Sequence, residues 1–163
     1  MDLEEVPEAV KEFAEKLPRF DDGRIDYHGS KKAPVVTVFV KLGKRILLMK
    51  RSDKVYTYRG RWNTVAGYLD ELKPLREKIL EELEEETGVG EGQILSIRVR
   101  EVYRFTDKGR TWMVHPALVE VKPGTEIKLD WEHTEYRWIN PEDLKGYDTV
   151  PHLEEGLKIV LAD

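Results

Sequence analysis

An α+β sandwich is the fold class that this 163-residue sequence predicts, and three observations support it. Runs of β-branched and apolar residues precede one internal helical stretch, similar runs follow it, and a second apolar helix closes the chain. Strands and helices that alternate in this way pack as layers around one core. The length is most simply explained by one domain with a sizeable core.

The N-terminal part is predicted to be a helix followed by a loop. Apolar residues recur at helical spacing from Val6 to Leu17, Pro7 suits a first turn, and Pro18 ends the helix. Residues 19–33 carry turn signals and are predicted to be a loop. We therefore divide the chain into an extension, 1–33, and a main domain, 34–163. The extension is interpreted as a cap or packing piece, with a dimer contact and a part of a substrate pocket as alternatives.

The main domain is predicted to contain several strands and a closing helix. A hairpin of strands 35–41 and 45–51 turns at Gly43, and strand 62–67 leads into the helical stretch. Two alternating strands, 93–107 and 111–121, meet at a Lys108-Gly109 turn, and shorter strands are expected at 126–129 and 135–139. A short helical turn is expected at 141–144, and Pro151 opens the last helix.

The stretch from Gly67 to Val89 carries the chemistry. Six carboxylates fall within residues 77–86, and about 100° per helical residue places Glu82, Glu85 and Glu86 on one face. Carboxylates at this spacing repel one another, whereas a hard divalent cation such as Mg²⁺ or Mn²⁺ prefers such oxygen ligands. A Glu-rich helix face is most often simply solvated. Here, however, a Gly precedes Glu82 by 15 residues and a Thr87-Gly88 helix stop follows.

These residues resemble the Nudix box, whose pattern is G-x5-E-x7-R-E-U-x-E-E-x-G-U, with U apolar. Seven of the nine specified positions match in register: Gly67, Glu82, Leu83, Glu85, Glu86, Gly88 and Val89. Weaker resemblance covers about residues 34–161. The resemblance implies a Nudix hydrolase with an α/β/α sandwich, a mixed sheet, and the box as strand, loop and helix.

Two positions depart from the pattern, and both reverse the sign of the charge. Lys73 replaces the family's Glu, and Glu81 replaces its Arg. Our hypothesis is that these two side chains keep an ion pair of inverted polarity and so preserve the geometry between loop and helix. The alternative is two unpaired surface charges and a lost orientation of Glu82.

The resemblance also implies the roles of the site residues. Glu82, Glu85 and Glu86 would bind Mg²⁺ or Mn²⁺, with the carbonyl of Gly67 as a further ligand. The general base would be one of these glutamates or Glu132, which precedes Trp138 by six residues; Glu135 is the alternative. His115 and His133 are interpreted as structural.

The predicted substrate is a nucleoside diphosphate linked to another moiety, and the reaction is hydrolysis of its diphosphate linkage. Arg51, Tyr58, Arg59 and Arg61 combine basic and aromatic groups that suit phosphates and a base. The segments around them resemble an archaeal-type Nudix subgroup without an assigned substrate. The alternative function, suggested by the reversed charges, is a catalytically weak module that binds or senses a ligand.

Composition limits the remaining function classes. The formal charge of −5 gives no general reason to expect nucleic-acid binding, which needs a basic face, and the absence of Cys rules out thiolate metal sites and disulfides. No signal peptide and no membrane span are visible, so we expect a cytoplasmic protein that works on a small molecule. A homodimer is an expectation from the family. The high content of charged residues, 36%, fits a thermophilic source.

Overall fold

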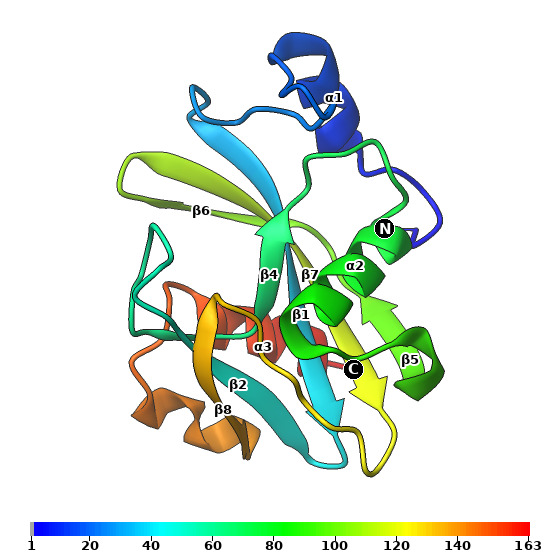
Figure 1. The fold of residues 1–163 in the computed structure, drawn as a ribbon, viewed down its shortest axis with the longest axis vertical. Coiled ribbons are helices and arrows are strands. Elements are labelled where there is room, and N and C mark those ends of the chain that lie inside the picture. Colours follow the sequence, from blue (N-terminus) through cyan, green and yellow to red (C-terminus); the bar gives the residue numbers. More distant parts are fainter. Residues whose placement is uncertain (1) are drawn as a thin grey trace.

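The computed structural model describes residues 2–163 and is shown in Figure 1; Met1 lies outside the described residues. Residues 2–163 contain three α-helices, α1 (Glu8–Lys16), α2 (Leu75–Thr87) and α3 (Leu153–Leu161). Two short 3-10 helices span Glu91–Gln93 and Pro141–Gly146. The strands are β1 (Lys32–Leu42), β2 (Arg45–Arg51), β3 (Trp62–Asn63), β4 (Val65–Tyr68), β5 (Ile94–Val99), β6 (Tyr103–Asp107), β7 (Arg110–Val121) and β8 (His133–Ile139).

The eight strands within residues 2–163 form one mixed sheet, as the resemblance noted in the sequence implies. β1 and β7 are long and parallel, in register from Lys32↔Thr111 to Lys41↔Glu120. The other pairs are antiparallel: β1 with β2 and β4, β2 with β3 and β8, and β7 with β5 and β6. The two long central strands therefore hold the sheet together, and shorter strands extend it on either side.

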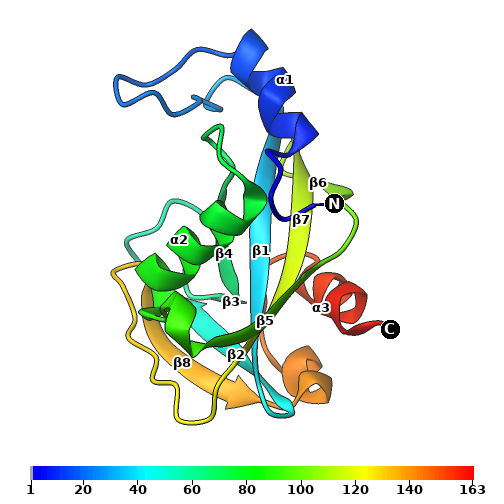
Figure 2. The ribbon, with the colours of Figure 1, turned by 90° about the vertical axis from the view of Figure 1, so that its right-hand side faces the viewer.

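Helices cover both faces of this sheet, so the predicted α/β/α sandwich is confirmed. Figure 2 shows α2 on one side of β1 and β7 and α3 on the other. One apolar cluster contains Ile79 and Leu83 of α2, and a second contains Leu153, Leu157 and Val160 of α3. Side chains along β1 alternate between the two faces, because successive residues of a strand point to opposite sides. The sheet is thus buried on both faces in the way that a three-layer fold requires.

Three expectations from the sequence are wrong in detail. The predicted strand 62–67 is divided into β3, which pairs with β2, and β4, which pairs with β1. The predicted single strand 93–107 is two strands, and the break lies opposite Pro116 of β7, which has no N–H to donate to a neighbour. Residues 126–129 do not form a strand. Ile127 and Leu129 pack against the core, but the backbone N–H of Lys128 donates to the carbonyl of Thr87 at the end of α2 (2.8 Å), so the segment runs beside a helix end.

The N-terminal helix lies at one end of the molecule, above the sheet in Figure 1. It begins after Pro7 and ends before Pro18, as the sequence predicts. Val10 is fully buried in the cluster that contains α2, and Phe13 packs against that cluster. The extension is therefore packed onto the main domain.

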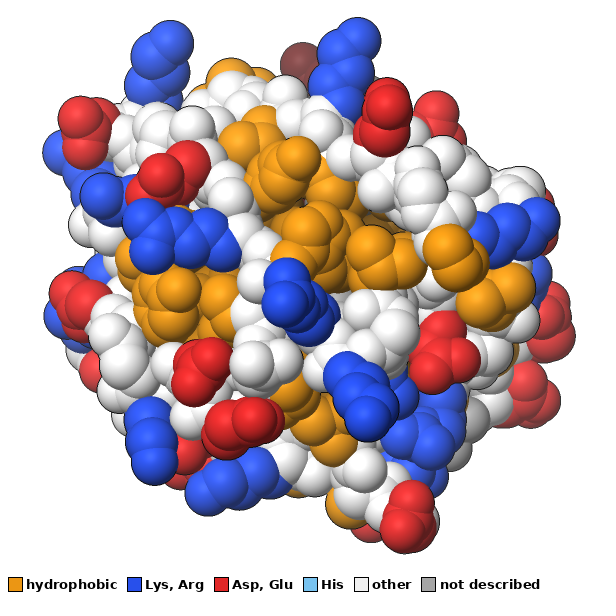
Figure 3. Space-filling view, turned by 90° about the horizontal axis from the view of Figure 1, so that it is seen from below, with side chains coloured by type: hydrophobic (Ala, Val, Ile, Leu, Met, Phe, Trp, Pro, Cys, Tyr) orange, Lys and Arg blue, Asp and Glu red, His pale blue; other side chains and the backbone are white. Residues whose placement is uncertain are grey.

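The face seen in Figure 3 carries a band of apolar side chains with acidic and basic side chains interspersed around it. No helix within residues 2–163 has the length and apolar character needed to cross a membrane.

Candidate active site

The acidic helix α2 has the boundaries and the buried stripe that the sequence predicts. It begins after Pro74 and ends at Thr87; Gly88 adopts φ 73° and its N–H donates to the carbonyl of Glu84 at 2.9 Å. This left-handed conformation costs glycine little, so Gly88 stops the helix. Ile79 and Leu83 are fully buried against the sheet. This packing presents the neighbouring glutamates to the loop after β4.

The three predicted metal-binding glutamates lie at different depths. Glu85 is exposed, Glu82 is partly buried, and Glu86 is only 2% exposed. Oε1 of Glu86 lies 3.5 Å from the backbone N–H of Ala66 and 3.8 Å from Nε2 of His133. Oε2 of Glu86 has no hydrogen-bond partner among the described residues. A buried carboxylate oxygen without a partner is costly, and a bound cation would supply the missing interaction.

Position 67 requires a glycine because the carboxylate of Glu82 lies directly against its backbone. A Cβ built on Gly67 would lie 2.4 Å from Cδ of Glu82 and 2.6 Å from both of its carboxylate oxygens. No side chain larger than hydrogen fits there without moving Glu82. The first glycine of the box thus serves the close approach of a carboxylate to strand β4.

Lys73 and Glu81 form the ion pair of inverted polarity that is expected from their reversed charges. Nζ of Lys73 lies 2.6 Å from Oε1 of Glu81 and 3.1 Å from Oε2 of Glu71. The hydrogen bond to Glu81 is the main cause that raises the pKa of Lys73 above its ordinary value. Glu81 also lies 3.5 Å from Nζ of the buried Lys78, which pairs with Asp70 and Glu71 as well. The loop and the helix are therefore joined by opposite charges despite the reversal.

A charge-restoring double variant tests this pair. Lys73→Glu and Glu81→Arg should each destabilise the protein, while the double variant should recover about 0.2–1 kcal/mol relative to additivity, as is typical of partly exposed pairs. The measurement is the urea-induced unfolding of all four proteins. Lys78 loses its Glu81 partner in both proteins that carry Arg at position 81. The free-energy cost of this loss therefore cancels in the double-mutant cycle that the four proteins form. Strict additivity would contradict the pairing.

A cavity of about 480 Å³, which we call the acidic cavity, opens beside these groups. It is lined by six carboxylates and two cations, together with Ala66, Gly67, Tyr68 and Trp131; the charged residues are Asp70, Glu81, Glu82, Glu85, Asp130, Glu132, Arg24 and Lys78. Such a concentration of negative charge suits divalent cations and is unfavourable without them. The acidic cavity therefore has the donor chemistry of a metal-binding site.

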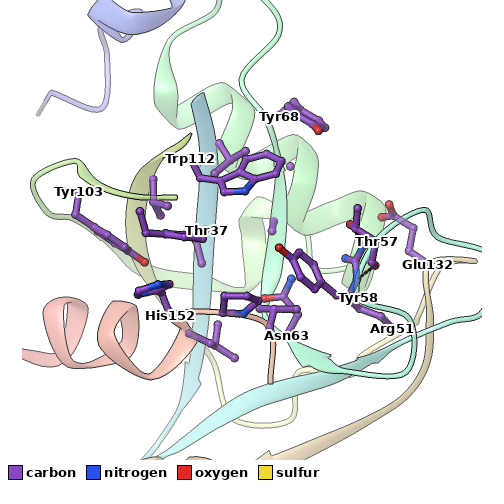
Figure 4. Close-up of a pocket in the computed structure, with 18 residues that line it drawn as sticks. Thr37, Arg51, Thr57, Tyr58, Asn63, Tyr68, Tyr103, Trp112, Glu132 and His152 are labelled. Carbon is purple, nitrogen blue, oxygen red and sulfur yellow. Dashed lines mark hydrogen bonds between the residues drawn. The ribbon is translucent and has the colours of Figure 1, made fainter. Parts of the chain in front are cut away.

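A second cavity of about 220 Å³, which we call the aromatic cavity, lies on the α3 side of the sheet (Figure 4). Its walls include five aromatic side chains: Tyr58, Tyr68, Tyr103, Phe105 and Trp112. It shares Ala66, Gly67, Tyr68 and Glu132 with the acidic cavity. An apolar and an acidic compartment thus meet at strand β4 and Glu132.

Of the four predicted substrate-binding residues, only Arg51 and Tyr58 line the aromatic cavity. The guanidinium of Arg51 donates from Nε to the carbonyl of Thr57 (3.0 Å), and burial lowers its pKa. Tyr58 adopts φ 51° and its hydroxyl donates to Asp107, which joins loop 52–61 to the β6–β7 turn. Burial is the largest cause that raises the pKa of Tyr58 to about 12.

Arg59 and Arg61 lie outside both cavities. Nε of Arg59 donates to the carbonyl of Val55 at 2.7 Å, so this side chain stabilises its own loop. Arg61 lies over the ring of Tyr58 (5.7 Å) and 3.9 Å from Asp148. The geometry does not support the predicted substrate contact for these two residues. Alternation of basic and aromatic residues in a loop does not specify which of them turn inward.

Glu132 lies at the boundary between the two cavities, whereas the alternative base, Glu135, is exposed on β8 beside Arg137. Burial and the neighbouring Asp130 raise the pKa of Glu132 to about 7. His133 is buried between Asp130 and Glu86. Its Nδ1 lies 3.1 Å from Oδ1 of Asp130, and its Nε2 lies 3.8 Å from Oε1 of Glu86. His115 is buried and lines a third cavity, which is formed with residues of the N-terminal segment; burial lowers its pKa.

The acidic residues predict how stability depends on pH in the absence of metal. Burial raises the pKa of Glu82 to about 7 and that of Glu86 well above its ordinary value. In the unfolded chain these carboxyls have a pKa of about 4.3, so the folded protein binds more protons at pH values between the unfolded and the folded pKa. With EDTA, the free energy of unfolding should therefore fall as pH rises from about 4.5 through about 7, and urea midpoints would show it. Saturating Mg²⁺ should reduce this fall; a midpoint that rises over the same interval in EDTA would contradict the assignment.

The residues present fit a divalent cation by their chemistry. The donor set is carboxylate oxygen, and Glu86 supplies a buried oxygen that has no partner within the described chain. In residues 2–163 no three acidic or histidine side chains already converge on one coordination point. The fit therefore rests on the donor chemistry, on Glu86, and on the approach of Glu82 to Gly67.

The family model named NUDIX domain matches residues 31–158. The chain belongs to the Nudix family. The Nudix fold and the enzyme class expected from the sequence, a hydrolase acting on phosphoric anhydrides, are confirmed.

Relatives of this Nudix protein include nucleoside triphosphatase NudI of Escherichia coli O139:H28, which is 27% identical over 113 residues, 63% of this chain and 77% of the relative. A MutT protein from Methanosarcina mazei Go1 has a similar fold, with TM-score 0.65, 22% identity, and coverage of 78% of this chain and 91% of that one. The NUDIX domain of Shewanella oneidensis NrtR, complexed with ADP ribose, has TM-score 0.65 and 15% identity, with coverage of 78% and 86%. The two structural similarities concern the fold.

Several residues of this Nudix site are not identified by the sequence analysis. Asp70 and Asp130 enter the acidic cavity from loops, and Trp112 and Tyr103 enter the aromatic cavity from β7 and β6. Lys78 has a signal in the sequence, because this charge lies within the apolar stripe of α2. The positions of the other four residues depend on which strands and loops become neighbours, and the local sequence does not determine this.

Proposed function

We propose that this Nudix protein uses a divalent cation to hydrolyse the diphosphate linkage of a nucleoside diphosphate joined to another moiety. The observation that carries the proposal is the junction of the aromatic and acidic cavities at Gly67 and Glu132. A nucleoside diphosphate derivative has the same two parts, a flat apolar base and a charged diphosphate. NudI, by its name a nucleoside triphosphatase, and the NrtR domain bound to ADP ribose are relatives or structural neighbours consistent with such a substrate.

The aromatic cavity suits the base of the substrate. Aromatic side chains bind nucleobases by stacking, which is worth about 1–3 kcal/mol per base in single-stranded nucleic acid complexes. Tyr68 and Trp112 lie with ring centroids 5.9 Å apart at one end of the cavity, and Phe105 stacks on His152 at 4.3 Å. Arg51 lies on the side of Glu132 (Figure 4), where it suits the phosphate adjacent to the nucleoside.

The acidic cavity suits the reacting phosphates. Glu82, Glu85 and Glu86 would hold Mg²⁺ or Mn²⁺, which supplies neutralisation of phosphate charge and a lowered pKa of bound water. Glu132, with a pKa of about 7, accepts the proton of the attacking water as general base. Its place at the boundary puts it next to both parts of the substrate. The carbonyl of Gly67 remains a predicted further ligand.

Turnover on a panel of compounds tests the function. The panel contains nucleoside triphosphates, nucleotide sugars, ADP-ribose and dinucleoside polyphosphates, each with Mg²⁺, with Mn²⁺ and with EDTA. Metal-dependent cleavage that Glu85→Gln removes would support the hydrolase. Tight metal-dependent binding without cleavage would instead favour the alternative, a ligand-binding or regulatory module, which the reversed charges at Lys73 and Glu81 suggest.

The finer expectations from the sequence stay predictions. They are the archaeal-type subgroup, the cytoplasmic location, the thermophilic source, the homodimer, and the division of the chain at residues 33 and 34. The family match begins at residue 31 and β1 begins at Lys32, so the first strand starts within the segment 1–33.

A further inference from the structure

The N-terminal extension is hydrogen-bonded to the loop of the Nudix box. The backbone N–H of Ile25 donates to the carbonyl of Asp70 at 2.8 Å, and the hydroxyl of Tyr27 donates to the carbonyl of Leu69 at 2.6 Å. Tyr27 also stacks on Tyr68, which lines both cavities, with ring centroids 5.9 Å apart. Ile25 and Tyr27 precede the segment 31–158 that matches the family model. A part of the chain outside that segment thus touches the site.

The same extension caps the acidic helix. Pro74 at the N-cap of α2 provides no side-chain hydrogen bond to the first turn. Instead, the N–H of Leu75 donates to the carbonyl of Glu5 (3.0 Å), and that of Arg76 donates to the carbonyl of Leu3 (2.8 Å). Exposed N–H groups at a helix start require such partners. The extension is therefore held at both the loop and the helix of the box.

This attachment fixes the position of Arg24. The carbonyl of Arg24 accepts from the N–H of Phe20 (2.8 Å), and its own N–H donates to Oδ1 of Asp22 (3.0 Å). The next residue is Ile25, which is bound to Asp70. The side chain of Arg24 then lines the acidic cavity, which Glu82 and Glu85 also line.

Arg24 and Lys78 are the two cations of the acidic cavity, and they differ in what they already bind. Nζ of Lys78 lies within 3.5 Å of carboxylates of Asp70, Glu71 and Glu81, and its side chain is 5% exposed. Within residues 2–163, the single ion pair of Arg24 joins Nε to Asp22 at 3.5 Å, and its side chain is 52% exposed. The two terminal NH2 groups of Arg24 are thus able to bind a ligand. A guanidinium matches phosphate in a bidentate geometry.

We propose that Arg24 is a substrate-binding residue that contacts the phosphate groups in the acidic cavity, and that the N-terminal extension is part of the site. This inference rests on the proposed function, because it takes the same diphosphate as ligand. Arg24 adds a positive group on the side of the cavity reached from the extension, whereas Arg51 lies toward the aromatic cavity. The extension then has two of the roles considered for it: it packs on the main domain and caps α2, and it forms a part of the substrate pocket.

The test compares Arg24→Gln and Arg24→Lys with the wild type and with Lys16→Gln. Lys16 is an exposed residue at the end of α1 outside both cavities, so its variant loses the same charge at a distance. Binding of α,β-methylene-ATP is measured by calorimetry in Mg²⁺, and KM and kcat are measured on the best compound of the panel. We expect Arg24→Gln to raise Kd and KM about tenfold, since a hydrogen bond to a charged group is lost. Changes in kcat should stay below about twofold, and Arg24→Lys should recover part of the affinity.

The outcomes separate this inference from the hydrolase proposal. Cleavage and analogue binding that Arg24→Gln leaves unchanged, or that Lys16→Gln weakens equally, would overturn the role of Arg24 alone. Absence of cleavage together with analogue binding that depends on Arg24 would support that role and overturn the hydrolase. A wild type that neither binds the analogue nor cleaves any compound would overturn both. Unchanged melting temperatures of the three variants will show that they are folded, as the exposure of both side chains leads us to expect.

Discussion

Glu86→Gln should lower kcat by about 100-fold or more while it makes the metal-free protein more stable at neutral pH. The activity falls because a buried carboxylate oxygen, which has no partner within the described chain, is lost from the metal-binding set. The stability rises because burial and the neighbouring Glu82 raise the pKa of Glu86, so its ionised form destabilises the fold. A neutral amide removes this charge and retains an oxygen for the N–H of Ala66.

Three measurements check this prediction: kcat with Mg²⁺, affinity for Mn²⁺ by calorimetry, and thermal unfolding in EDTA at pH 7.5. For a domain of this size, each kcal/mol gained in the free energy of unfolding should raise Tm by about 2–4 °C. The matched control is Glu77→Gln, which removes a charge from the exposed side of the same helix. Lower stability of Glu86→Gln in EDTA would show that the carboxylate stabilises the apo fold and would contradict the assignment.

Gly67→Ala should lower activity about 100-fold by displacing Glu82, with a loss of Mn²⁺ affinity of about 10–100-fold. The added methyl would lie 2.4 Å from Cδ of Glu82, a distance that side chains do not tolerate. Gly67 is absent from the glycines with positive φ, so the backbone itself accepts Ala and the effect is steric. The affected group is therefore the carboxylate, and the strand should remain intact.

The control for this variant is Gly146→Ala, because a Cβ at that position meets no atom within 4 Å and no positive φ is involved. Far-ultraviolet circular dichroism and Tm separate a displaced side chain from a disrupted fold. Wild-type kcat and Mn²⁺ affinity in Gly67→Ala would show that the position of Glu82 seen here is not the one used with metal.

Much of the fold follows from local patterns in the sequence. The limits of α1 are set by Pro7 and Pro18, and Gly88 ends α2 because few other residues adopt its φ of 73°. The hairpin of β1 and β2 turns at Gly43, as expected from the runs of apolar residues on either side. Patterns of this kind depend on neighbours in the chain, so they can be read without knowledge of tertiary structure.

The errors arise where a partner distant in the chain decides the outcome. The break between β5 and β6 is caused by Pro116, which lies on a different strand. Residues 126–129 have the apolar content of a strand, but their neighbour is the end of α2. Arg59 and Arg61 differ from Arg51 in orientation, and this depends on the path of loop 52–61 over the sheet.

The acidic helix, its three candidate metal-binding glutamates and the opposite charges of Lys73 and Glu81 can be predicted from the sequence alone, because each depends on spacing along one helix or loop. Tertiary packing, by contrast, buries Glu86 with no partner for Oε2 among residues 2–163, places Glu132 where two cavities meet, and brings Arg24 to the acidic cavity. Burial and convergence depend on which segments pack together. The physical reason is that desolvation and proximity, which set the chemistry of a carboxylate, exist only once distant parts of the chain are in contact.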